Sequence, residues 1–277
     1  VGGRIFTKKD FIGEGLFTEC GGEFIDSRHR NMLKLAAEFN LPLIDTLSAA
    51  ERELARDSFY IDGVYYSEAE VISAFEPYAK RIATDISSLP NYFGIDDFTP
   101  NVLRLDQLSI SGYFDSIGMP ASLFLRKGLE LAYVTEYGLE ASEQTAINFL
   151  YLFYINPGNN SYDIFGISDE RYKIAGGNQR IVEALYQGLQ QQVVLGAALT
   201  AVTKNNADVY TLQFTGAPPA SADIVVMTLP FTLLRQVDLT GLGLPSWKTG
   251  AIQNLGYGTN AKLLLGFGNR NWRNYAH

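Results

Sequence analysis

The feature that most constrains this chain is a predicted strand, glycine turn and helix within residues 169–189. A short strand is expected to end at Ile174, and the pair Gly176-Gly177 permits a turn that is too tight for a side chain. The helix that follows should pack on a sheet through one apolar stripe. The unit therefore predicts a fold in which strands and helices pack together.

A cap and an anion-binding site are predicted at the start of that helix. Asn178 is placed to cap it, and apolar residues recur along one face at Ile181, Val182, Leu185 and Leu189. The first turn should present unpaired backbone amides, which favour an anion such as a phosphate. A plain capped turn is the alternative, because the glycines lack the spacing of a dinucleotide-binding fingerprint.

Composition limits the partners and metals of the chain. The formal charge of −8 disfavours nucleic acid and anionic membrane surfaces. Cys20 cannot form a disulfide within the chain, and one cysteine with two histidines cannot make an ordinary structural zinc site. We therefore expect neither a nucleic-acid partner nor a metal.

Apolar runs are too short for a membrane span. The longest, residues 146–155 and 224–234, fall short of the ~20 residues that a spanning helix needs. We expect a soluble protein, and its compartment stays open between the cytoplasm and export.

A second and a third glycine pair lie near the start of the chain. The first is Gly2-Gly3, and the other is Gly21-Gly22. Asp26 or Ser27 is placed to cap a following helix. The apolar face of that helix would comprise Met32, Leu33, Leu35, Ala36 and Phe39.

The sequence pattern of residues 43–167 is typical of an inserted helical domain. Helices are expected over Ser67–Leu89, from about Leu105, from Met119-Pro120, over Leu123–Tyr137 and over Ser142–Ile155. Four tyrosines in the last two could face a substrate, although aromatic residues at helical spacing are more often core: Tyr133, Tyr137, Tyr151 and Tyr154.

The last third of the chain favours strands. Residues 193–202 and 209–214 predict a hairpin, and residues 223–229 predict a strand buried on both faces that ends at Pro230. Lys262 lies among apolar residues, which is typical of a strand edge with the amine in water.

These motifs, in this order and spacing, resemble the flavin-containing amine oxidases, the family that includes monoamine oxidases and L-amino acid oxidases. Gly2-Gly3-Arg4 is similar to the GGR motif, whose arginine approaches the flavin pyrophosphate. The segment Gly21 to Ile25 resembles the one that passes along the flavin ring and ribityl chain.

The resemblance implies a set of cofactor-binding residues: Gly2, Gly3, Arg4, Gly22, Glu23, Phe24, Val193 and Pro230. Val193 matches the valine whose backbone holds the adenine, and residues 223–230 match a strand that returns to the flavin domain. Lys262 matches the catalytic lysine that reaches flavin N5 through a water, and Trp272 follows at the family's interval. The implied cofactor is FAD.

The residues also account for the implied chemistry. Glycines let a backbone approach a pyrophosphate, and an arginine adds a charged contact to it. A lysine held by apolar neighbours can have a lowered pKa and organise a water, which suits the reaction of reduced flavin with oxygen. The expected partners are a small-molecule amine and molecular oxygen, with homodimer formation left open.

The resemblance is incomplete at both ends. Family members begin with a strand and G-x-G-x-x-G and finish with a glycine-rich flavin segment, and neither is present. We therefore expect an interior fragment that holds flavin weakly or not at all by itself. The expected architecture is α+β, a partial Rossmann-like FAD-binding domain (1–45 and 172–233) interleaved with a largely helical substrate domain (46–171 and 234–277).

Three functions stay open at this point. The first is FAD-dependent oxidation of an amine to an imine, with an L-amino acid oxidase as its variant. Phe24 stands where that branch has a carboxylate-binding arginine, which favours amines without a carboxylate, although Arg28 could substitute. The second is a non-catalytic binding fragment, and the third is a related flavin desaturase or dehydrogenase.

Overall fold

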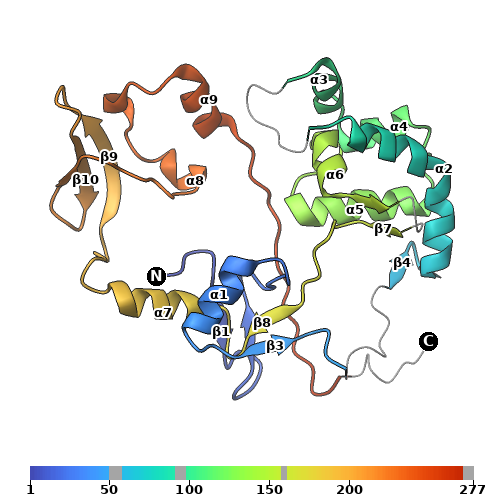
Figure 1. Cartoon of the computed structure of the whole chain (residues 1–277), viewed down its shortest axis with the longest axis horizontal. Helices are drawn as coiled ribbons and strands as arrows, with labels where there is room; N and C mark the ends of the chain where they lie inside the picture. Colours follow the sequence, from blue (N-terminus) through green and yellow to red (C-terminus); the bar gives the residue numbers. More distant parts are fainter. Residues whose placement is uncertain (50–57, 91–97, 157–160, 271–277) are drawn as a thin grey trace. The chain divides into compact units, whose positions relative to one another are not determined.

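The computed structural model describes residues 1–49, 58–90, 98–156 and 161–270 (Figure 1). It combines helices with small antiparallel sheets, which is a mixed α+β architecture. Two compact units can be separated. The first unit is Val1–Ala184 with Thr259–His277, and the second unit is Leu185–Gly258.

Two small sheets organise the start of the first unit. β1 (Thr7–Lys9) pairs with β2 (Phe17–Glu19), and β3 (Leu43–Asp45) pairs with β8 (Tyr172–Ile174), both antiparallel. The strand predicted to end at Ile174 is thus confirmed. Its backbone joins two regions of sequence more than a hundred residues apart, because Ile44 lies opposite Lys173.

Helix α1 (Arg30–Glu38) packs on these strands as its pattern predicts. Ala36 is buried together with Ile25, Ile174 and Ile181. The predicted cap is wrong, since the N-cap residue is His29. Asp26 is engaged elsewhere, because its carboxylate accepts bonds from the Ser168 hydroxyl and the Glu170 N–H.

Helix α2 (Glu68–Ser87) confirms the longest predicted helix. Ser67 and Glu70 form a capping box at its start, which satisfies two backbone donors that the helix leaves free. Phe75 and Ile82 on its inner face are buried in a core shared with the shorter helices. These are α3 (Pro100–Asp106), α4 (Ile110–Ser116), α5 (Phe124–Tyr137) and α6 (Ala146–Leu152).

Some helix predictions in this region are wrong. No helix begins at Met119-Pro120, where a turn precedes α5 instead. The helix expected over 142–155 is shorter, because Thr145 caps α6 and the chain becomes extended at Phe153. The four tyrosines named above also differ in burial. Tyr133 is fully buried in the core, while Tyr137, Tyr151 and Tyr154 are exposed.

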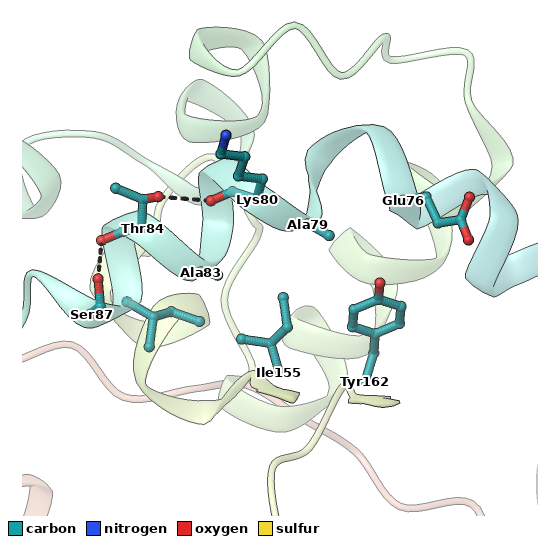
Figure 2. Close-up of a pocket in the computed structure, with 9 residues that line it drawn as sticks. Glu76, Ala79, Lys80, Ala83, Thr84, Ser87, Ile155 and Tyr162 are labelled. Carbon is teal, nitrogen blue, oxygen red and sulfur yellow. Dashed lines mark hydrogen bonds between the residues drawn. The ribbon is translucent and has the colours of Figure 1, made fainter. Parts of the chain in front are cut away.

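Two short hairpins accompany these helices, and three-residue strands are too short to show a periodic pattern in sequence. β4 (Phe59–Ile61) pairs with β5 (Val64–Tyr66), and β6 (Tyr154–Asn156) pairs with β7 (Ser161–Asp163). The β6–β7 hairpin contributes Ile155 and Tyr162 to a groove beside α2 (Figure 2).

The second unit is built on a three-stranded antiparallel sheet in the order β11-β10-β9 (Figure 1). Its strands are β9 (Ala198–Lys204), β10 (Tyr210–Thr215) and β11 (Ala220–Ala222). The predicted hairpin is confirmed, although its first strand begins at Ala198 because a turn at Gly196, with φ of 71°, precedes it. Three short helical segments follow: α8 (Phe231–Leu234), η1 (Thr240–Leu242) and α9 (Ser246–Asn254).

The predicted strand over 223–229 is wrong. The segment has no regular secondary structure and pairs with no strand among the described residues, and Ile224 and Val226 are each 82% exposed. An apolar run becomes a buried strand only when neighbouring strands satisfy its backbone, and the described residues supply none.

Helix α7 (Gln179–Leu189) follows the glycine turn as predicted, and it runs from the first unit into the second. Only the start of its apolar stripe is buried. Ile181 is 2% exposed, whereas Leu185 and Leu189 are 38% and 43% exposed. Across the described ranges, no helix has the length and apolar character that membrane crossing requires.

Candidate functional site

Two of the three glycine pairs lie against each other at the start of the first unit. Gly2 and Gly3 have φ angles of 108° and 55°, and the Gly2 carbonyl accepts the Ile5 N–H at 3.0 Å to close a turn. A Cβ on Gly21 would lie 1.8 Å from the Arg4 carbonyl oxygen. Glycine is therefore required at position 21 for the close approach of the two segments.

The outer side of this contact is open. A Cβ added to Gly3 or Gly22 would meet nothing within 4 Å, and the Arg4 side chain is exposed. The Gly22 N–H reaches the Arg4 carbonyl at 3.4 Å. The arrangement offers accessible backbone and a long cationic side chain on one surface, which is what an anionic ligand needs.

Asn178 connects this surface to the glycine turn before α7. Its Nδ2 donates to the carbonyls of Gly22 and Glu23 at 3.0 and 2.8 Å, and its Oδ1 accepts the Ile174 N–H at 2.9 Å. Asn178 directly precedes α7 and its carbonyl accepts the Ile181 N–H at 3.1 Å, but its side chain does not cap the helix as predicted. Its side chain instead ties two chain segments together.

The first amides of α7 are already bonded within the chain. The buried carboxylate of Glu19 accepts the Asn178 N–H at 2.8 Å, and the Thr7 hydroxyl accepts the Gln179 N–H at 3.1 Å. Thr7 in turn donates to Glu19 at 2.8 Å. The predicted free anion site at this helix start is wrong, because the protein's own carboxylate occupies it.

Glu23 is the centre of a charged cluster. Its Oε1 accepts the Lys173 ammonium at 2.6 Å, and its Oε2 accepts the Lys262 ammonium at 2.9 Å. Burial alone would raise the pKa of the Glu23 carboxyl, but the bonds from the two lysines outweigh it and hold that pKa below its usual range.

Lys262 is held by oxygen atoms. Besides Glu23, its ammonium donates to the carbonyls of Glu19 at 3.1 Å and Gly21 at 3.4 Å. The expectation of apolar surroundings is wrong, because the neighbouring Leu263 and Leu265 are 83% and 63% exposed. The segment also forms no strand in the residues that the structure describes.

Phe24 lies at the edge of this cluster. Its side chain is partly exposed, and the Lys173 ammonium lies 4.6 Å from the centre of its ring. A cation in this position is attracted by the ring face. Lys173 was not predicted as a site residue, because the three-residue strand β8 shows no pattern that singles it out and its partner Glu23 is distant in sequence.

The remaining predicted residues belong to the second unit or lie outside the described ranges. Val193 is half-buried in the loop before β9, and Pro230 is the N-cap residue of α8, both in the second unit. Trp272 lies outside the described residues. The described residues contain no group of three His, Cys, Asp or Glu side chains that could hold a metal ion.

Two hollows lie within the first unit. One of about 350 Å³ lies beside the glycine turn and is lined by Lys9, Asp10, Gly15, Leu16, Phe17, Gly176 and Arg180. The other, of about 780 Å³, is the groove between α2 and the β6–β7 hairpin. Figure 2 shows Tyr162 and Ile155 facing α2 across it, with Glu76 near one end.

The comparisons with known proteins decide the family. The model of the flavin containing amine oxidoreductases matches residues 1–276. The chain belongs to this family. The glycine surface at Gly3, Arg4 and Gly22, together with Lys262, is therefore part of an amine oxidoreductase fold.

Solved structures agree with this fold at low identity. Putrescine oxidase, wild type bound to putrescine, superimposes with a TM-score of 0.72 at 17% identity, over 93% of this chain and 56% of that one. Cyclohexylamine oxidase from Brevibacterium oxydans IH-35A gives 0.68 at 15%, over 90% of this chain and 55% of that one. This amine oxidoreductase chain thus spans about half the length of these structures. None of the curated protein sequences matches it.

Proposed function

We propose that the protein is an FAD-dependent amine oxidase, which removes two electrons and two protons from an amine to give an imine while oxygen is reduced to hydrogen peroxide. The observation that carries this proposal is the convergence of the glycine surface, Arg4 and Lys262 within one unit of a family member. The imine would then hydrolyse to a carbonyl compound.

The glycine surface fits the anionic part of FAD. A Cβ would find open space at Gly3 and Gly22, so a ligand could approach the backbone there, and Arg4 would add a charged contact to the pyrophosphate. Glu23 would be unfavourable near phosphate if it stood alone. Its two lysine partners leave the cluster with a net positive charge.

When bound, FAD would supply the hydride acceptor for the amine carbon and the electrons for oxygen. The residues of this chain would supply binding and proton handling. Lys262 would hold a water at its ammonium group, on the surface that it shares with Glu23 and the Gly21 carbonyl. Val193 and Pro230 stay proposed contacts to the cofactor, and the interleaved domain boundaries at 45, 171 and 233 stay proposals as well.

The proposed substrate is an amine without a carboxylate. Phe24 stands where the resemblance to L-amino acid oxidases would require an arginine, and the ammonium nearest its ring, that of Lys173, is paired with Glu23. Two structural neighbours are named for putrescine and cyclohexylamine, which lack a carboxylate.

The test is a peroxide assay on the protein purified from its complete gene and supplied with FAD. We expect peroxide with putrescine or cyclohexylamine and none with L-amino acids. Peroxide with L-amino acids alone would support the carboxylate-binding alternative. A retained flavin with no peroxide from any amine would contradict amine oxidation and favour a desaturase or dehydrogenase.

A further inference from the structure

The charged cluster around Glu23 is formed by residues from three segments that are far apart in the sequence. Glu23 follows β2, Lys173 is the central residue of β8, and Lys262 belongs to the extended segment after Thr259. Each lysine binds a different oxygen of the same carboxylate, at 2.6 and 2.9 Å. The two ammonium groups therefore compete for one negative charge.

The two lysines are held differently. Lys173 lies on a strand paired with β3, opposite Ile44, and its ammonium also faces the ring of Phe24. Lys262 comes from a segment outside the described strands, and its side chain is 40% exposed, against 25% for Lys173. A change in the charge of the cluster would thus move Lys262 more readily than Lys173.

Other charged groups lie near this cluster, and they shift the pKa of Glu170. The pKa of the Glu170 carboxyl is raised, first by burial and then by the negative charges of Asp26 and other carboxylates, which include Glu23. The positive charge of Lys173 acts against that shift. Lys173 therefore offsets part of the negative charge that acts on Glu170, in addition to its direct bond to Glu23.

We propose that Lys173 is a positioning residue that acts on Lys262 through Glu23. Its positive charge occupies one oxygen of the carboxylate and weakens the hold of Glu23 on the Lys262 ammonium. Lys262 then stays able to leave the carboxylate. The use of a releasable Lys262 near flavin rests on the proposed function, whereas the charge competition does not.

The test measures how fast the Lys262 amine reacts with an acylating reagent, N-acetoxysuccinimide, in protein free of FAD. Acylation requires the amine to leave Glu23 and lose its proton, and mass spectrometry of the Lys262 peptide gives the rate. Because these partly exposed charges interact through a high effective dielectric, effects of about threefold are expected.

The two variants should move the rate in opposite directions. Glu23→Gln removes the carboxylate, so acylation of Lys262 should be about threefold faster. Lys173→Met removes the competing ammonium, so Glu23 pairs with Lys262 alone. Acylation of Lys262 should then be about threefold slower. Lys173→Arg keeps the charge and should restore the wild-type rate.

Controls separate this proposal from a loss of structure. Lys8→Met changes an exposed lysine of β1 outside the cluster and should leave the rate unchanged. If Lys173→Met fails to fold, Lys173→Gln tests the same loss of charge. Faster or unchanged acylation in Lys173→Met or Lys173→Gln would overturn the proposal, because a purely structural role would loosen the site. Failure to bind FAD would contradict the proposed function and leave this measurement unaffected.

Discussion

The carboxylate of Glu19 accepts the backbone N–H of Asn178 at 2.8 Å, across 159 positions of sequence. This bond places a buried negative charge at the start of α7, where the amides and the helix dipole favour it. Thr7 completes the arrangement through bonds to both Glu19 and Gln179. The hairpin β1–β2 thereby fixes the glycine turn and the helix beside the proposed cofactor surface.

Glu19→Ala should destabilise the protein by about 2–4 kcal/mol, because the Asn178 N–H and the Thr7 hydroxyl would lose a buried partner. Glu19→Gln keeps an acceptor and should cost about half as much. Urea unfolding followed by circular dichroism measures both. Glu14→Ala, at an exposed position of the same hairpin, is the control, and an equal loss there would argue against a special role for Glu19.

The glycine turn gives a second, steric prediction. Gly177 has a φ of 107°, and a Cβ there would lie 2.2 Å from Thr7 Cγ2, so Gly177→Ala should cost more than about 2 kcal/mol. Gly188 lies within α7, and a Cβ there would meet nothing within 4 Å. Gly188→Ala should therefore be neutral or stabilise by up to about 1 kcal/mol. Similar unfolding midpoints for the two variants would contradict the close contact between Gly177 and Thr7.

The sequence predicted well where a local pattern was long. The 20-residue helix α2 has a repeated apolar face, which was visible in sequence. It predicted poorly where a partner decided the outcome. Residues 223–229 look like a buried strand, yet Ile224 and Val226 are exposed because no described strand pairs with the segment.

The candidate site shows the same division. The glycines and Lys262 could be chosen from sequence because their motifs resemble those of a family. Lys173 and the buried charge of Glu19 could not, because their roles depend on contacts between residues more than 140 positions apart. A side chain such as Asn178 also has several partners to choose from, and only the fold selects among them.

Stability should fall in alkaline solution through two tyrosines of the helical core. Burial, before any charge effect, raises the pKa of Tyr113 and Tyr133 far above the ordinary value of 10.0. The unfolded chain loses these protons first as the pH rises through about 10, so the stabilising contribution is present below that pH and is lost above it.

The expected slope above about pH 10 is roughly 1.4 kcal/mol per pH unit for each tyrosine. Urea midpoints at a series of pH values measure it. Tyr133→Phe lowers stability at neutral pH, because the bond to the Ile164 carbonyl is lost, but it should also make the slope shallower. An unchanged slope in Tyr133→Phe would show that other groups cause the alkaline loss.

Lys262→Met should slow the reoxidation of reduced flavin by oxygen in the complete protein. The variant removes the ammonium that the carbonyls of Glu19 and Gly21 hold on the proposed cofactor surface. Stopped-flow absorbance after anaerobic reduction measures the rate, with Lys8→Met as the matched control. Reoxidation at the wild-type rate would remove Lys262 from the oxygen reaction.

The central claim is that these residues belong to a flavin site that oxidises amines. The measurement that tests it most directly is the visible absorption spectrum of the protein from its complete gene, after incubation with FAD and dialysis, before and after anaerobic addition of cyclohexylamine. We predict a retained flavin band that the amine bleaches and air restores. A colourless protein, or a retained band that no amine bleaches, would contradict the claim.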